Sequence, residues 1–325
     1  MPFNVYVTRM IPRAGIDYLQ ENCETVDINP EDRVLSPQEL LEAIKERDGI
    51  LCLLTDNINE EVFDAARGAK VFANMAVGYD NIDVAEATRR GIAITNTPGV
   101  LTDATSDFAW ALLFSIARRV VEADKFTRAG KFVGWGPLVF LGGDITGRTL
   151  GIIGAGRIGT AVALKSPGFR MQVLYTDIQQ NETLEEKIGA RRVSLEELLE
   201  KSDFVSIHVN LTPDTQHLIG PRQLELMKPT AYLINTSRGP VIDEAALVEA
   251  LKEKKIAGAA LDVYEEEPKV HPELMKLDNV VLTPHIASAT IESRSKMALM
   301  AAENLVAVLK GKPPKNCVNP QVLKS

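Results

Sequence analysis

The sequence is short of cysteine and has fewer positive than negative charges. Its 325 residues include three cysteines, at positions 23, 52 and 317, with no C-x-x-C pair. This excludes a zinc ribbon and a disulfide framework, and no metal site is expected. Basic residues number 36 against 44 acidic ones, so the net charge is −8. The positive surface of a nucleic-acid-binding protein is therefore not expected.

Long hydrophobic runs and a signal peptide are also missing from the sequence. The longest apolar run, near residues 108–117, is about half as long as a membrane span and ends at two arginines. The first residues lack the basic and apolar regions of a secretory signal. A cytoplasmic protein that does not bind membranes is expected. Hydrophobic residues make up 45% of the chain, enough for a globular core, which excludes disorder as the main state.

Apolar segments of strand length alternate with helical ones along the whole chain. Strands are expected at residues 4–7, 49–54, 70–73, 92–95, 149–153, 172–176, 204–208, 231–235, 258–262 and 280–283. This alternation predicts an α/β protein with parallel sheets covered by helices. Long helices are expected at 102–119 and 290–310, separated from each other by the second α/β unit. The second unit is therefore predicted to be inserted into the first.

The segment 154–159, Gly-Ala-Gly-Arg-Ile-Gly, fits the G-x-G-x-x-G pattern of a dinucleotide-binding turn. Its three glycines would permit the tight turn, the approach of a pyrophosphate to the backbone, and close packing of helix on strand. Alone, the pattern equally fits an ordinary strand-to-helix turn. Here an apolar strand precedes it and a helix follows, which favours the dinucleotide interpretation.

An acidic residue, Asp177, ends the next expected strand, 18 residues after Gly159. This spacing suits a carboxylate that binds the adenosine ribose. Such a carboxylate would repel the extra phosphate of NADP, and residues 178–180 contain no arginine to bind it. The prediction is therefore NAD(H), although a solvated carboxylate at a strand end is the alternative.

Only four histidines are candidates for a proton donor. His208 and His285 both follow expected strands, where ligands gather in such sheets, so position does not choose between them. Arg238 also follows a strand, and its guanidinium could bind a carboxylate through two hydrogen bonds. Glu267 lies in an acidic run that, on composition alone, suggests a solvated loop.

Six motifs together resemble the D-isomer-specific 2-hydroxyacid dehydrogenases, over nearly all the chain from Gly49 to Pro314. They are AVGYDNID (76–83), NTPGVLTDATSD (96–107), GIIGAGRIG (151–159), INTSRGPVIDEAAL (234–247), GAALDVYEEEP (258–268) and NVVLTPHIAS (279–288). Two further segments, CLLTDNI (52–58) and WGPLVFLGGDITG (135–147), resemble the glyoxylate and hydroxypyruvate reductase branch of that family.

The resemblance implies an α/β fold of two Rossmann-like or flavodoxin-like domains, each a doubly wound parallel sheet. The nucleotide-binding domain, residues 101–284, would be inserted into a substrate domain made of residues 1–100 and 285–325. Such subunits are usually homodimeric, and their active site lies in the cleft.

The resemblance also implies roles for individual residues. Arg238 would bind the carboxylate and carbonyl of the substrate, His285 would be the acid/base, and Glu267 would pair with His285. This overturns the solvated-loop interpretation of Glu267 and selects His285 over His208. The cofactor-binding residues would be Thr102, Gly154, Ala155, Gly156, Arg157, Ile158, Gly159, Asp177, Thr236 and Asp262, the last at the nicotinamide end. The substrate-binding residues would be Leu54, Val77, Gly78, Trp135 and Arg238, with Trp135 reaching toward the partner subunit's substrate.

The expected function is reduction of a small 2-keto acid, glyoxylate or hydroxypyruvate, to the D-2-hydroxy acid. NADH would provide the hydride and His285 the proton. One alternative is another D-2-hydroxyacid dehydrogenase; the 3-phosphoglycerate enzyme needs a basic phosphate site and often a regulatory tail, and such a tail is not expected here. The other alternative is a non-enzymatic NAD-sensing protein with the same fold. The preferred keto acid and the physiological direction are not predicted.

Overall fold

The computed structural model describes residues 3–324 and divides the chain into two compact units. Unit 1 consists of the residues up to Leu101 together with those from Ala289 onward. Unit 2, Thr102–Ser288, is continuous in sequence and interrupts unit 1. The chain therefore enters and leaves unit 2 once.

Unit 1 contains a five-stranded parallel sheet with the strand order β2-β1-β3-β4-β5. The strands are β1 (Asn4–Val7), β2 (Thr25–Ile28), β3 (Gly49–Cys52), β4 (Val71–Asn74) and β5 (Ala93–Thr95). This is the doubly wound order in which the direction of winding reverses between β1 and β3. Ligands bind such sheets beyond the carboxyl ends of the strands.

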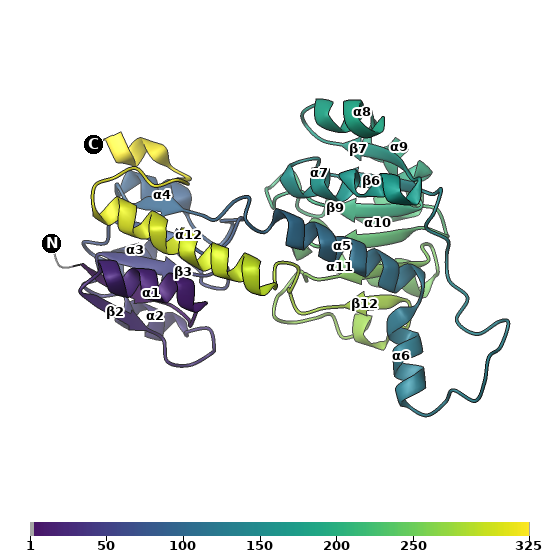
Figure 1. Ribbon diagram of the computed structural model, residues 1–325, viewed down its shortest axis with the longest axis horizontal. Coiled ribbons are helices and arrows are strands. Elements are labelled where there is room, and N and C mark those ends of the chain that lie inside the picture. The colour runs from purple at the N-terminus through teal and green to yellow at the C-terminus, as the bar shows by residue number, and fades with distance from the viewer. Residues whose placement is uncertain (1–2, 325) are drawn as a thin grey trace. The chain divides into compact units, whose positions relative to one another are not determined.

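Helices cover both faces of the unit 1 sheet. Helices α2 (Pro37–Ala43), α3 (Glu60–Ala65) and α4 (Val84–Arg89) pack on one face, around a buried cluster that includes Phe63 and Phe72. Helices α1 (Arg13–Asn22) and α12 (Ile291–Leu309) lie side by side on the other face (Figure 1). They approach closely at Gly15, where a Cβ atom would lie 2.7 Å from the carbonyl oxygen of Ala298.

Unit 2 contains a seven-stranded parallel sheet with the order β12-β11-β10-β9-β6-β7-β8. The strands are β6 (Thr149–Ile153), β7 (Gln172–Thr176), β8 (Arg191–Arg192), β9 (Phe204–Ile207), β10 (Tyr232–Asn235), β11 (Gly258–Leu261) and β12 (Val280–Leu282). Because every pair is parallel, the carboxyl ends of all seven strands lie at one edge. The winding reverses between β6 and β9, where dinucleotides bind in sheets of this order.

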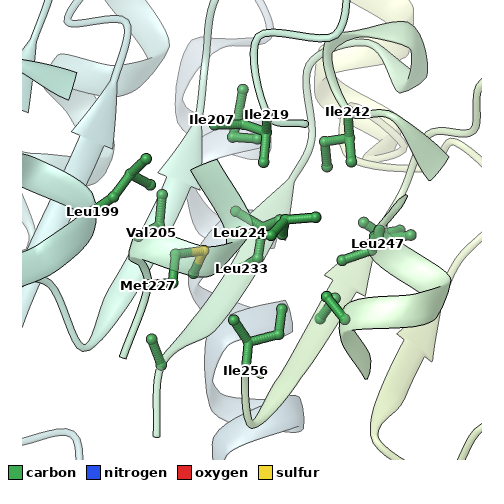
Figure 2. Close-up of a cluster of buried hydrophobic side chains, with 14 of the residues drawn as sticks. Leu199, Val205, Ile207, Ile219, Leu224, Met227, Leu233, Ile242, Leu247 and Ile256 are labelled. Atoms are coloured by element: carbon green, nitrogen blue, oxygen red, sulfur yellow. The ribbon is translucent and has the colours of Figure 1, made fainter. Parts of the chain in front are cut away.

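The core of unit 2 forms on both faces of its sheet. Helices α5 (Thr102–Ala117), α7 (Arg157–Leu164) and α8 (Glu182–Ile188) cover one face. Helices α9 (Leu195–Lys201), α10 (Pro221–Leu226) and α11 (Glu244–Lys252) cover the other, where Val205, Leu233 and Leu247 belong to one buried cluster (Figure 2). Two doubly wound parallel sheets, one unit interrupting the other in sequence, confirm the expected fold class.

The helix expected at 102–119 is present as α5 but ends two residues earlier, and a separate helix that was not expected follows it. Helix α5 ends at Ala117, and α6 (Val120–Arg128) begins after Arg119, which has a left-handed backbone with φ of +53°. That conformation breaks a helix, and the Arg119 guanidinium is held by Glu122 at 2.6 Å. The short 3₁₀ helices are η1 (Ser166–Phe169), η2 (Gly239–Val241), η3 (Leu274–Lys276) and η4 (Pro320–Lys324). Between residues 3 and 324, no helix combines the length and apolar content needed to span a membrane.

Candidate active site

The candidate residues of unit 2 gather at one edge of its sheet, because each follows the carboxyl end of a strand. Gly154 follows β6, Asp177 follows β7, His208 follows β9, Arg238 follows β10, Asp262 follows β11 and His285 follows β12. Strands β10, β11 and β12 are neighbours in the sheet. The sheet order thus brings together Arg238, Asp262 and His285, which are separated by up to 47 residues in the chain.

His285 and Glu267 form a hydrogen-bonded pair. The distance between His285 Nδ1 and Glu267 Oε2 is 2.8 Å, and Glu267 Oε1 accepts a hydrogen bond from the Tyr264 N–H at 3.0 Å. The two side chains are 24% and 30% exposed, so the pair is neither sealed in the core nor fully solvated. Because the carboxylate holds Nδ1, the ring is oriented with Nε2 as the nitrogen that can exchange a proton with a ligand.

Glu267 is held in its ionised form. Burial raises the pKa of this carboxyl, but the hydrogen bond and charge of His285, the Tyr264 N–H and the charge of Arg238 outweigh burial and lower it below the usual value. An anionic Glu267 stabilises positive charge on the His285 ring.

The lowered pKa of Glu267 implies a pH-dependent contribution to stability. A carboxylate favoured by the folded state contributes fully above its unfolded pKa, and the contribution is lost as pH falls through the lower folded value. We expect Glu267→Gln to lower Tm by roughly 2–4 °C at pH 7, as for a loss of about 1 kcal/mol, and to lower it less and less below pH 4.5. Calorimetry at a series of pH values measures this difference.

Glu266→Gln is the matched control, because it removes the same charge from the neighbouring residue. The Glu266 side chain is exposed and makes no side-chain hydrogen bond within residues 3–324. Equal Tm losses in the two variants, or a Glu267→Gln loss that does not change with pH, would contradict the assignment.

Asp262 holds the turn that carries His285. Its carboxylate is fully buried, with Oδ1 accepting hydrogen bonds from Thr283 Oγ1 at 2.7 Å and the Ile286 N–H at 2.8 Å, and Oδ2 from the Ala287 N–H at 2.7 Å. His285 has a left-handed φ of +56°. A non-glycine residue in this conformation costs about 1–3 kcal/mol, which these hydrogen bonds offset. Burial raises the pKa of Asp262, opposed by the same hydrogen bonds.

The turn that carries Arg238 packs directly on the segment that leads to Glu267. A Cβ atom at Gly239 would lie 1.9 Å from the carbonyl carbon of Tyr264, so only glycine permits this contact. Asn235 Nδ2 donates to the Arg238 carbonyl at 2.9 Å and fixes the turn from within. The guanidinium and the carboxylate of Glu267 are therefore held on two backbone segments in contact with each other.

His208 is unsuited to donate a proton near neutral pH. Burial lowers the pKa of His208 to about 3, so the ring is neutral. Its Nε2 lies 2.8 Å from Ser206 Oγ. Both histidines follow strands, so their positions alone did not show which one is the proton donor. The buried, neutral state of the His208 ring favours His285.

The glycine turn after β6 fits a dinucleotide. Gly154 has φ of +90°, and a Cβ atom at Gly159 would lie 2.0 Å from the Gly154 carbonyl oxygen, so both are required by the turn itself. A Cβ atom at Gly156, by contrast, would meet nothing within 4 Å. This open space adjoins the start of α7 at Arg157, where unpaired N–H groups and the helix dipole favour phosphate oxygens.

A buried hydroxyl on the neighbouring strand also lacks a partner. Thr236 follows β10 and is 8% exposed, and within the described residues its Oγ1 forms no hydrogen bond. Buried polar atoms normally find partners, so an unpaired one at this edge is suited to bind a ligand. Thr102 lies at the first position of α5.

Arg192 is a residue that the sequence reasoning missed. Asp177 Oδ2 accepts a hydrogen bond from the Ala155 N–H at 2.7 Å, as expected for a carboxylate beside the glycine turn. Arg192 donates to the carbonyls of Asp177 at 2.8 Å and Ile178 at 3.0 Å. Its signal was the Arg-Arg pair of the short edge strand β8, which pairs with β7 opposite Tyr175. An arginine is thus close to the residue proposed to bind the ribose.

The remaining candidates lie elsewhere. In unit 1, Leu54 follows β3, and Val77 and Gly78 follow the adjacent β4; all three are half-buried. Trp135 lies in the loop after α6 and is 86% exposed. Within residues 3–324, no cluster of three or more His, Cys, Asp or Glu side chains could hold a metal ion.

Comparisons with known proteins identify the family of this chain. Residues 110–287 match the family described as D-isomer specific 2-hydroxyacid dehydrogenase, NAD binding domain. The chain is similar to the glyoxylate reductases of Korarchaeum cryptofilum (54% identity over 98% of this chain and 97% of the relative) and Thermococcus gammatolerans (52% identity, 98% and 97%). The crystal structure of a glyoxylate reductase from Paecilomyes thermophila is similar with a TM-score of 0.87 at 33% identity, covering 99% of this chain and 100% of that one. This chain therefore belongs to the D-isomer specific 2-hydroxyacid dehydrogenase family and is an NAD-dependent dehydrogenase.

Proposed function

We propose that this enzyme reduces glyoxylate or hydroxypyruvate to the D-2-hydroxy acid with NADH. The observation that carries the proposal is the His285–Glu267 pair, 2.8 Å apart, on the same sheet edge as Arg238 and the glycine turn. The choice of substrates is supported by relatives named glyoxylate reductase that are more than half identical to this chain.

The proton and charge steps are assigned to three side chains of unit 2. Arg238 binds the substrate carboxylate and polarises its keto oxygen. His285 donates the proton from Nε2 to that oxygen, while Glu267 holds Nδ1 and stabilises the imidazolium before transfer. When bound, the nicotinamide supplies the hydride.

The cofactor is assigned to the glycine turn of unit 2, which we propose as the nucleotide-binding domain. The N–H groups around Gly156 bind the pyrophosphate, and Asp177 binds the adenosine ribose. Unit 1 is proposed as the substrate domain, with Val77 and Gly78 donating backbone hydrogen bonds to the carboxylate and Leu54 lining the site.

Steady-state oxidation of NADH in the presence of glyoxylate tests the proposal. A panel of 2-keto acids identifies the preferred substrate, and chiral analysis of the product establishes the D configuration. An NAD-sensing protein would bind NADH, seen by fluorescence titration, but would turn over none of the keto acids. That result would reject the enzymatic assignment of these residues.

We assign the preference between NADH and NADPH to two residues with opposing effects. Asp177 favours NADH and Arg192 favours NADPH. We expect Asp177→Ala to reduce the preference for NADH over NADPH about 10- to 100-fold, because a charged hydrogen bond is lost and a repulsion removed. In that background Arg192→Ala should remove much of the gain with NADPH, because its guanidinium is placed to bind the 2′-phosphate. Values of kcat/KM with both cofactors measure this.

Arg191→Ala is the control for Arg192→Ala. Arg191 is the adjacent residue of β8 but is paired with Glu197 at 3.0 Å. If both substitutions reduce NADPH use equally, general charge and not a specific contact accounts for the effect.

The loop 130–147 supports a homodimer. It exposes several large apolar side chains, among them Val133 (98%), Trp135 (86%) and Leu138 (79%). Apolar side chains gathered in this way are typical of protein interfaces. We assign the loop to contact with a second copy of the chain, with Trp135 directed to the partner's substrate. The mass of the protein in solution tests whether the chain forms a dimer.

A further inference from the structure

We propose that three asparagines of unit 1, Asn74, Asn81 and Asn96, are positioning residues for the substrate carboxylate. They hold the backbone of the loop 76–79 so that its N–H groups point toward the anion. The inference rests on the proposed function, in which Val77 and Gly78 bind that carboxylate through their backbone. It adds the side chains that set the direction of those N–H groups.

Three consecutive carbonyls of the loop are each held by another segment of unit 1. The Ala76 carbonyl accepts a hydrogen bond from the Thr97 N–H at 2.8 Å. The Val77 carbonyl accepts one from Asn96 Nδ2 at 2.8 Å, and the Gly78 carbonyl one from Asn74 Nδ2 at 3.0 Å. Asn74 ends β4 and is fully buried, so its amide is itself fixed.

Holding these carbonyls determines where the next N–H groups point. In a trans peptide the N–H of residue i+1 points opposite to the C=O of residue i. The N–H groups of Val77, Gly78 and Tyr79 therefore point away from the groups that hold the carbonyls. Within residues 3–324, none of these three N–H groups donates a hydrogen bond. Adjacent unpaired backbone N–H groups form a concave site for an anion.

Asn81 connects this loop to the one that carries Leu54. Its Nδ2 donates to the carbonyls of Leu53 at 3.1 Å and Asp56 at 2.9 Å, and its Oδ1 accepts from Asn74 Nδ2 at 3.1 Å. The two loops follow neighbouring strands, β3 and β4. One amide network therefore fixes both loops.

The chemistry of the amide suits this task. An asparagine side chain donates two hydrogen bonds and remains neutral, whereas a lysine or arginine would add a competing cation. Asn74 and Asn81 each donate two hydrogen bonds through Nδ2, so both hydrogens of each amide are used. These residues touch no reacting atom and act only through the backbone that they hold.

The test uses Asn96→Ala and Asn81→Ala in the full-length enzyme. We expect KM for glyoxylate to rise about 10- to 100-fold, because a displacement of about 1 Å in a binding group has effects of this size. The Kd of NADH, measured by fluorescence, should not change. The ratio of kcat/KM for glyoxylate to that for its uncharged methyl ester should fall, because only the former presents a carboxylate to the N–H groups.

Asn319→Ala is the matched control for a purely structural role. Asn319 is in the same unit, is 1% exposed, and bonds the Ile92 carbonyl at 2.9 Å and the Ile94 N–H at 2.8 Å, away from both loops. Asn319→Ala should lower Tm without changing the ratio of kcat/KM for glyoxylate to kcat/KM for its methyl ester. If the ratio in Asn96→Ala and Asn81→Ala equals that of active wild type, the inference is overturned while the proposed function stands. Wild-type enzyme that does not reduce glyoxylate overturns both.

Discussion

His285→Ala is expected to lower kcat for keto-acid reduction by about 10²–10⁴-fold, the usual contribution of a general acid. The alanine variant keeps the glycine turn and Asp177, so NADH should bind with unchanged Kd. The physical reason is that the Glu267 carboxylate holds Nδ1 at 2.8 Å and leaves Nε2 free for the role we propose, protonation of the keto oxygen. Single-turnover rates at saturating NADH separate this loss from changes in substrate binding.

His208→Gln is the control for His285→Ala. The ring of His208 is already neutral, because burial lowers its pKa to about 3, and a glutamine can keep the hydrogen bond to Ser206. Its effect on kcat should be much smaller. Wild-type turnover in His285→Ala, or a larger loss in His208→Gln, would move the proton donor away from residue 285.

Arg238→Ala should lower kcat/KM for the keto acid about 10²–10³-fold, mostly through a higher KM. Removing one partner of a hydrogen-bonded charge pair costs about 2–5 kcal/mol of binding free energy. The lower end of this range applies where solvent reaches the site. Arg238→Lys should recover little of the loss, because an ammonium cannot form two parallel hydrogen bonds to a carboxylate. Initial rates with varied keto acid at saturating NADH measure both variants.

The control is Arg222→Ala on α10, which removes the same charge from an exposed position of unit 2. If KM rises equally in both variants, the effect is one of net charge. If KM in Arg238→Ala is that of wild type, Arg238 does not bind the substrate.

Much of the fold could be predicted because buried parallel strands are continuous apolar runs. Strands β6 and β7 lie at the expected residues, and the positions after strands located Gly154, Arg238 and His285. Glu267 could not be recognised from composition, since its role depends on a partner 18 residues away that only the pairing of β11 and β12 brings close. The family motifs, and not local pattern, supplied that residue.

Other features have little or no local signal. The end of the first long helix was expected near residue 119, but α6, which begins directly after the left-handed Arg119 and has no buried side chain, was not. Strand β8 has two exposed arginines and no apolar pattern. In the sequence, Asn74, Asn81 and Asn96 look like ordinary polar residues. Their shared role depends on contacts among the loops after β3, β4 and β5. Contacts between segments distant in sequence decide the last two cases.

The division of unit 1 into two stretches of sequence has a consequence for synthesis on the ribosome. Helix α12 packs on α1 and on β3, β4 and β5, yet it is translated roughly 200 residues after Leu101. At the usual rate of elongation, the part of this sheet face that α12 covers remains exposed for about 10–40 s. Unit 2 is complete in the nascent chain before α12 is added, so strands β3, β4 and β5 are exposed to aggregation until the helix that covers them is translated.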